Sequence, residues 1–166
     1  GSGQDAIITK VKPDGTGILF TAIISGSANE TGYRICYEYP FVYMAGQTIS
    51  SDIPVTSAAF QKSKASNQDV FFVKIAEDGT QLITCSYLGG KNVENVYAIF
   101  ASNQNVYIGG GTLSSDFPKS SGSYNKILKG TKDAFLFKYN TASDSLIFSS
   151  LIGGSSLDDI YGINEE

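Results

Sequence analysis

The chain repeats itself at a spacing of 64 residues, and this repeat constrains the fold more than any other feature of the sequence. The phrase ISSDIP at 49–54 returns as LSSDFP at 113–118, and a shift of 64 residues aligns the chain with itself without a gap. Residues 5–67 and 69–131 are identical at 19 of 63 positions, far above chance. Self-similarity at this length is typical of solenoids, propellers and domain arrays.

Each unit contains four short segments with strand character, which we label a to d. In the first complete unit they span 32–38, 41–47, 69–75 and 81–88, and an Asp-Gly turn between the last two favours a hairpin. These segments are apolar on both faces, which is typical of sheets covered on both sides. Four-stranded antiparallel sheets around an axis meet this condition because each is covered by its neighbours. The sequence therefore predicts an all-β fold built of β-propeller blades.

The repeat divides the chain into parts of one propeller domain. We expect strands c and d of a partial blade in 1–31, whole blades in 32–95 and 96–159, and the start of a further blade in 160–166. About two and a half blades cannot close a ring, and open end blades would expose apolar faces to water. We therefore expect the chain to be a fragment of a longer propeller, or one of several copies that complete a ring.

Several phrases resemble the seven-bladed β-propeller repeat family, also called SBBP repeats. They are DVFFVKI at 69–75, YLGG at 87–90, VYIGGG at 106–111 and SSDFP at 114–118, followed by Tyr124. The first unit departs from the pattern, with IISG at 23–26 and SSDIP at 50–54. The resemblance covers essentially the whole chain. It implies an all-β propeller in a secreted or surface-exposed setting, and no particular reaction.

Composition argues against several classes of function. The net charge of −4 provides no basic patch for nucleic acid, and no apolar run approaches the roughly 20 residues of a membrane span. The chain contains no histidine, which removes the usual general base, the common nucleophile pairs and most zinc sites. We expect no catalytic residues, no metal site and no cofactor.

The recurring aspartates and prolines, Asp52, Pro54, Asp116 and Pro118, are interpreted as a structural repeat motif. Each motif opens a b–c loop of about twenty residues, at the edge where the d–a connections also emerge. Ser and Asp can bond local backbone N–H groups, and Pro restricts the turn that follows. Calcium binding by the aspartates is the alternative, but neither loop supplies several nearby acidic ligands. Phe60 and Tyr124, in turn, are expected to pack these loops against a blade.

Residues that break the repeat are better candidates for function. Arg34 lies on the strand expected to be innermost, where Glu38 could pair with it, either for a ligand or as a structural ion pair. The second b–c loop is richer in lysine than the first, and its candidate binding residues, which could equally be a solvated surface, are Lys119, Lys126 and Lys129. Asn29 starts a glycosylation sequon, meaningful only in a eukaryotic secreted protein.

These features favour a noncatalytic extracellular or cell-surface module for binding or adhesion, with protein or glycan contacts on the face of the long b–c loops. The alternative is a structural repeat unit of a surface assembly or filament, and a propeller hydrolase or lyase is a third reading.

The two cysteines, Cys36 and Cys85, fall on strands a and d of one blade, roughly 14 Å apart, too far for a disulfide. Both should be free and buried.

Overall fold

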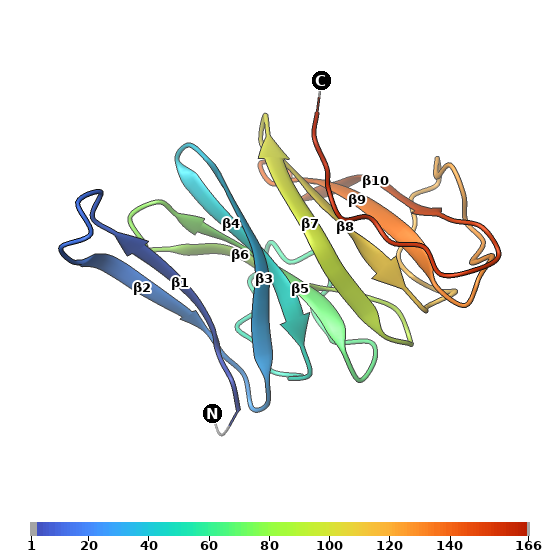
Figure 1. Ribbon diagram of the computed structural model, residues 1–166, viewed down its shortest axis with the longest axis horizontal. Coiled ribbons are helices and arrows are strands. Elements are labelled where there is room, and N and C mark those ends of the chain that lie inside the picture. The colour runs from blue at the N-terminus through green and yellow to red at the C-terminus, as the bar shows by residue number, and fades with distance from the viewer. Residues whose placement is uncertain (1–2, 166) are drawn as a thin grey trace.

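The computed structural model describes residues 3–165, and these form ten β-strands (Figure 1). Their bounds are β1 (Ala6–Val11), β2 (Ile18–Ile24), β3 (Glu30–Glu38), β4 (Phe41–Thr48), β5 (Asp69–Ala76), β6 (Leu82–Leu88), β7 (Glu94–Ser102), β8 (Asn105–Thr112), β9 (Asp133–Asn140) and β10 (Ser145–Ile152). Within the described residues there is no helix long and apolar enough to cross a membrane.

The strands form two four-stranded antiparallel meanders preceded by a hairpin. Strands β3-β4-β5-β6 make the first blade, β7-β8-β9-β10 make the second, and β1-β2 form the N-terminal hairpin. The three sheets lie side by side, each packed against the next (Figure 1). The first strand of the second blade, β7, contacts β3, β4 and β5 of the first blade. The chain is therefore all-β and forms part of a β-propeller, as the repeat predicts.

Turn chemistry explains where the hairpins reverse. Between β5 and β6, Gly79 has a φ of +75°, and Asp78 accepts a hydrogen bond from the N–H of Thr80 at 3.0 Å. Between β7 and β8, the two loop residues Asn103 and Gln104 both have positive φ, which matches the right-handed twist of the flanking strands. Short local signals thus set the c–d and a–b connections.

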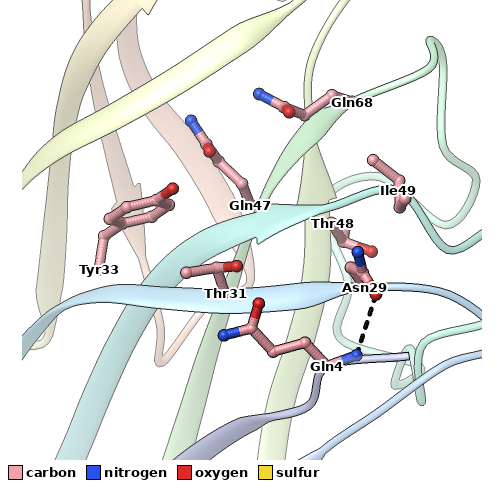
Figure 2. Close-up of a pocket in the computed structure, with 8 residues that line it drawn as sticks. All are labelled: Gln4, Asn29, Thr31, Tyr33, Gln47, Thr48, Ile49 and Gln68. Carbon is pink, nitrogen blue, oxygen red and sulfur yellow. Dashed lines mark hydrogen bonds between the residues drawn. The ribbon is translucent and has the colours of Figure 1, made fainter. Parts of the chain in front are cut away.

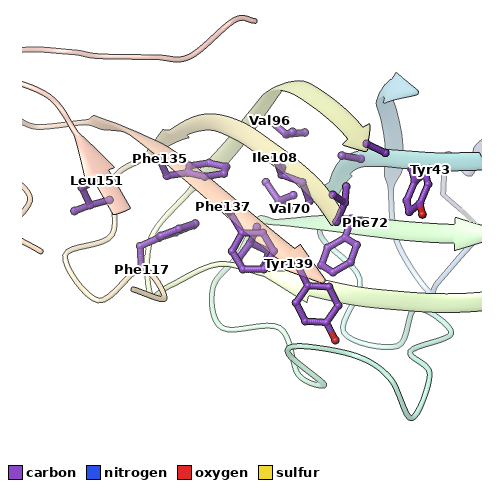
Figure 3. Packing of buried hydrophobic residues seen from close by; sticks show 14 residues of the cluster. Tyr43, Val70, Phe72, Val96, Ile108, Phe117, Phe135, Phe137, Tyr139 and Leu151 are labelled. Atoms are coloured by element: carbon purple, nitrogen blue, oxygen red, sulfur yellow. The ribbon is translucent and has the colours of Figure 1, made fainter. Parts of the chain in front are cut away.

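Strand β5 shows why both faces of a blade must be apolar. Residues 69–75 are all buried. The apolar ones alternate between two hydrophobic clusters. Phe71 and Val73 face the N-terminal hairpin, where Ile8 packs against the first blade. Val70 and Phe72 face the second blade. Figure 3 shows the cluster between the blades, whose labelled members are Tyr43, Val70, Phe72, Val96, Ile108, Phe117, Phe135, Phe137, Tyr139 and Leu151.

Strand a differs from the expected strand in two ways. It begins at Glu30 in the first blade and Glu94 in the second, two residues before the predicted starts at 32 and 96. It also contains a β-bulge, because Gly32 pairs with Gly46 whereas Arg34 pairs with Ala45. The second blade has the same register shift between Val96 and Ala98. The bulge leaves Tyr33 and Tyr97 unpaired, a geometry that re-aims a side chain.

The aromatic residues of the two b–c loops behave differently. Phe60 packs edge-on against Phe137 of the second blade, with ring centroids 5.1 Å apart. Tyr124, one repeat later, is 84% exposed, so the prediction that it packs against a blade is wrong for the described residues. The physical reason is that Phe60 contacts the sheet of the following blade, whereas among residues 3–165 no further four-stranded sheet follows the blade of Tyr124.

Cys36 and Cys85 are both free, as predicted from their strands. Cys85 is buried and Cys36 is half-buried, so only the first fully matches the expected burial. Burial raises the pKa of each thiol to about 12.

Candidate functional site

One face of the molecule carries the long loops and the connections between blades. Strand a begins, strand b ends and strand c begins at this edge, because the four strands alternate in direction. We define the loop face as this edge, with the d–a connections 25–29 and 89–93 and the b–c loops 49–68 and 113–132.

The repeated SSD phrase joins the b–c loop to the preceding d–a connection. Asp52 Oδ1 accepts hydrogen bonds from the N–H of Ser27 at 2.8 Å and from its hydroxyl at 3.0 Å. Asp116 Oδ1 accepts from the N–H of Lys91 at 3.0 Å. These bonds lower the pKa of Asp52. Both aspartates therefore have the same partner position, and each holds two loops of the scaffold together.

The residue between the Asp and the Pro is the buried member of the motif. Ile53 is 3% exposed and Phe117 is 1% exposed, and the Phe117 ring stacks on Phe135 with centroids 4.5 Å apart. Pro54 is exposed and Pro118 is half-buried. Sequence reasoning selected the aspartates and prolines and did not assign a role to this apolar position.

A buried carboxyl group lies at the first residue of each strand a. Glu30 and Glu94 are fully buried, and Thr48 and Thr112 donate hydrogen bonds to them at 2.7 and 2.8 Å. Ser114 also donates to Glu94, at 2.5 Å. Sequence reasoning missed this network, although the acidic residue, the threonine and the serine all recur at 64 residues.

The carboxyl group of Glu94 has less complete hydrogen bonding than that of Glu30. Its pKa is raised to about 7, chiefly because burial disfavours the charged form, and the charge of Asp69 adds to the effect. Its Oε2 atom has no well-formed hydrogen bond within the described residues, although the N–H of Gly90 is close. In Glu30 the corresponding oxygen accepts from the N–H of Gly26 at 2.6 Å.

An open pocket with a cavity volume of about 240 Å³ lies on the loop face of the first blade. We call it the amide pocket, and Figure 2 shows its eight lining residues: Gln4, Asn29, Thr31, Tyr33, Gln47, Thr48, Ile49 and Gln68. They come from the start of β3, the end of β4 and the residues just before β1 and β5. Side chains of Gln4, Thr31, Gln47 and Gln68 gather on one side of Asn29 and Ile49 (Figure 2).

The amides of the pocket are only partly used by the protein. Gln47 Nε2 donates to Asn95 Oδ1 at 2.7 Å, and Gln68 Nε2 donates to the carbonyl of Glu94 at 3.3 Å. Asn29 Oδ1 accepts from the backbone N–H of Gln4 at 2.9 Å (Figure 2). Within residues 3–165, the Oε1 atoms of both glutamines have no partner. The protein thus fixes the donor ends of these two amides and leaves their acceptor ends free.

The corresponding place one repeat later is built differently. Gln47 is replaced by Gly111 and Gln68 by Lys132, and Lys132 Nζ lies 2.6 Å from Asp159 Oδ1. A Cβ at Gly111 would lie 2.1 Å from that aspartate oxygen, so the glycine is needed to admit the ion pair. The first unit thus has the neutral amides Gln47 and Gln68 where the second unit has a glycine and a lysine.

The predicted partner of Arg34 is wrong. Arg34 Nε donates to the carbonyl of Tyr97 at 2.6 Å, and Nη1 donates to the carbonyl of Tyr33 at 2.9 Å. These are the carbonyls of the two bulge residues, so the guanidinium bridges β3 and β7. Glu38 lies at the other end of β3 and accepts from the N–H of Gln104 at 3.3 Å.

The three candidate lysines lie in the second b–c loop and none of them lines the amide pocket. Lys119 Nζ donates to the carbonyl of Ser115 at 2.6 Å, whereas Lys126 and Lys129 are exposed. Among the described residues no group of three or more His, Cys, Asp or Glu side chains is placed to hold a metal ion.

No protein-family model matches the chain, and no curated protein matches it. Two solved structures with a similar course of the backbone are mutants of the apocarotenoid oxygenase of Synechocystis, with TM-scores of 0.46 and 0.44. Each is 8% identical to this chain, and the match covers 87% of this chain and 32% of the oxygenase chain. The chain therefore spans about a third of the length of those structures.

Proposed function

We propose that the chain belongs to a noncatalytic β-propeller module of the SBBP repeat type, which binds a protein or a glycan through its loop face. The setting we propose is extracellular or at the cell surface. The amide pocket carries this proposal, because it is open on the loop face at a place where two otherwise similar units differ. Binding sites are grafted on a fold at such variable positions, whereas recurring residues such as Asp52 and Asp116 serve the scaffold.

The chemistry of the lining supports binding over catalysis. Gln, Asn and Thr side chains donate and accept hydrogen bonds but do not transfer protons near neutral pH. The buried acids Glu30 and Glu94 are bonded to threonines of the scaffold and are closed to solvent. The whole chain has no histidine that could replace them as a base.

A structural repeat unit is the second candidate, and the outer face of the N-terminal hairpin favours it. Ile7 and Ile23, which are paired across β1 and β2, are each 60% exposed, and Val11 and Ile18 are 58% and 65% exposed. Such a face needs a cover, and further copies of the chain or the rest of a longer chain would provide one. Concentration-dependent assembly without ligand binding would favour this candidate.

Amide chemical shifts in solution test the proposed function. The isotope-labelled chain would be titrated with hits from a glycan array and from a panel of extracellular proteins. We expect the backbone amides of the loop face to shift, residues 25–31 and 47–52 above all, while the c–d turn at 77–80 stays unchanged. Shifts confined to the opposite edge, turnover of a glycoside panel, or no binding to any probe would contradict the proposal.

A further inference from the structure

Resting on the proposed function, we propose that the amide pocket binds one neutral sugar ring of a glycan, with Tyr33 as the apolar platform and the free amide oxygens of Gln47 and Gln68 as acceptors for its hydroxyls. The geometry that points to this ligand comes from the bulge, the unused hydrogen-bonding atoms and the absence of charge in the lining.

Tyr33 is the bulge residue whose aromatic ring stays accessible. It is 45% exposed and lines the pocket beside Thr31 (Figure 2). The equivalent Tyr97 is already covered, because its ring stacks on Tyr161 with centroids 4.8 Å apart and lies 5.3 Å from Lys132 Nζ. A pyranose ring has an apolar face of C–H groups, and such a face packs by dispersion on an open aromatic ring.

The polar atoms left free by the protein match the hydroxyls of a sugar. The Oε1 atoms of Gln47 and Gln68 are acceptors, and the two donor ends of these amides are held by Asn95 and Glu94. Each side chain is therefore pre-oriented before a ligand arrives, which reduces the entropy lost on binding. Thr31, on the same wall, adds a hydroxyl that both donates and accepts.

Charge and size favour a small neutral ligand. None of the eight lining residues carries a charged side chain, and the neighbouring acids Asp69 and Glu94 disfavour an anion. Arg34 is held by two backbone carbonyls of the bulges. The volume of about 240 Å³ is smaller than the roughly 300–1,000 Å³ of pockets for drug-sized ligands, and it suits a single ring.

The second unit provides a template for substitutions that should close the pocket, because an ion pair fills the equivalent place there. The triple substitution Gln47→Gly, Gln68→Lys and Asn95→Asp copies the arrangement of Gly111, Lys132 and Asp159 to the equivalent positions one repeat earlier. Because this arrangement already folds one repeat later, the variant should keep the melting temperature within a few degrees. Tyr33→Ala removes the platform alone, and Tyr124→Ala is the matched control for loss of an exposed tyrosine.

The test is a glycan array followed by calorimetric titration with the best neutral and best anionic oligosaccharides. We expect a neutral glycan to bind, with affinity reduced at least about tenfold in the triple variant and in Tyr33→Ala, and unchanged in Tyr124→Ala. Glycan binding that survives both pocket variants, or selective binding of anionic glycans, overturns this inference and leaves the proposed binding function standing. Binding to proteins alone has the same consequence. No binding to any glycan or protein overturns both.

Discussion

The carboxyl groups of Glu94 and Asp69 converge on Gly89, where a Cβ atom would lie 2.6 Å from Glu94 Oε2 and 2.7 Å from Asp69 Cγ. Both acidic side chains are fully buried. The glycine is thus a steric requirement of the acid pair, and the same contact recurs at Gly153, which meets Asp133 and Asp158.

Glu94 makes folding depend on pH in the neutral range. Its pKa is about 7 in the folded chain, against an ordinary value of 4.5. The favourable contribution of Glu94 to the free energy of unfolding is therefore complete below about pH 4.5 and is lost as the pH rises through 7. The difference corresponds to at most roughly 3 kcal/mol. Glu94→Gln should therefore raise the free energy of unfolding at pH 8 relative to wild type by more than at pH 5, as measured by urea denaturation at both pH values.

Glu30→Gln is the matched control for this prediction. Glu30 holds the same position one repeat earlier, but its Oε2 accepts a hydrogen bond from Gly26. We expect no gain at pH 8 from this variant. An equal gain in both variants would show that the gain does not come from the raised pKa of Glu94.

The two serines of the LSSDFP motif should respond differently to loss of the hydroxyl. Ser114 is buried, donates to Glu94 and accepts from the N–H of Asn92 at 2.8 Å, whereas Ser115 is exposed. Ser114→Ala leaves these partners unsatisfied and should reduce the free energy of unfolding by about 1–3 kcal/mol. Ser115→Ala should change it by less than about 0.5 kcal/mol. Equal effects in chemical denaturation would contradict the assigned roles.

Phe117 should be the stability anchor of the same motif. It is 1% exposed and stacks on Phe135, so Phe117→Ala should reduce the free energy of unfolding by about 3–5 kcal/mol. Tyr124→Ala, in the same loop, should stay within about 0.5 kcal/mol of wild type because that side chain is exposed. Thermal unfolding followed by circular dichroism would rank the two, and a larger loss for Tyr124 would show that its loop packs differently in solution.

The thiols provide a test of strand order that needs no substitution. Cys36 lies on β3 and Cys85 on β6, at opposite edges of the first blade. A colorimetric thiol assay without reductant should find two thiols in denaturant. In the native chain at pH 8 both should react slowly, since burial raises their pKa to about 12 and little thiolate forms. Detecting no thiol in denaturant would mean a disulfide, which is incompatible with this sheet order.

Much of the architecture could be predicted from the sequence because local and repeated signals agree. The Asp-Gly turn before Thr80, the apolar run at 69–75 and the 64-residue register together indicate four-stranded sheets covered on both faces. The position of the site could not be predicted in the same way. A bulge depends on how two strands pair. The residues around Tyr33 therefore do not indicate by themselves that its side chain lies on the same pocket wall as Gln47.

The candidate binding residues show the same limit. Arg34 is unusual for its strand, and the sequence indicates that it needs partners, but it could not distinguish a carboxylate from the two free carbonyls that the bulges create. Glu30 and Glu94 recur at the repeat spacing, yet acidic residues are ordinarily expected at the surface. Their burial follows from the hydroxyls of Thr48 and Thr112, which meet them only when β3 and β4, and β7 and β8, are paired.

The apolar layer between neighbouring sheets has a consequence for how the protein unfolds. Strand β5 has both of its faces in such layers, one shared with the hairpin and one shared with the second blade. A blade cannot separate from its neighbour without exposing the whole apolar layer between them, so we expect neighbouring blades to unfold cooperatively. The free energy of unfolding should then rise in nearly equal steps with each further 64-residue unit, as in a one-dimensional chain of coupled elements.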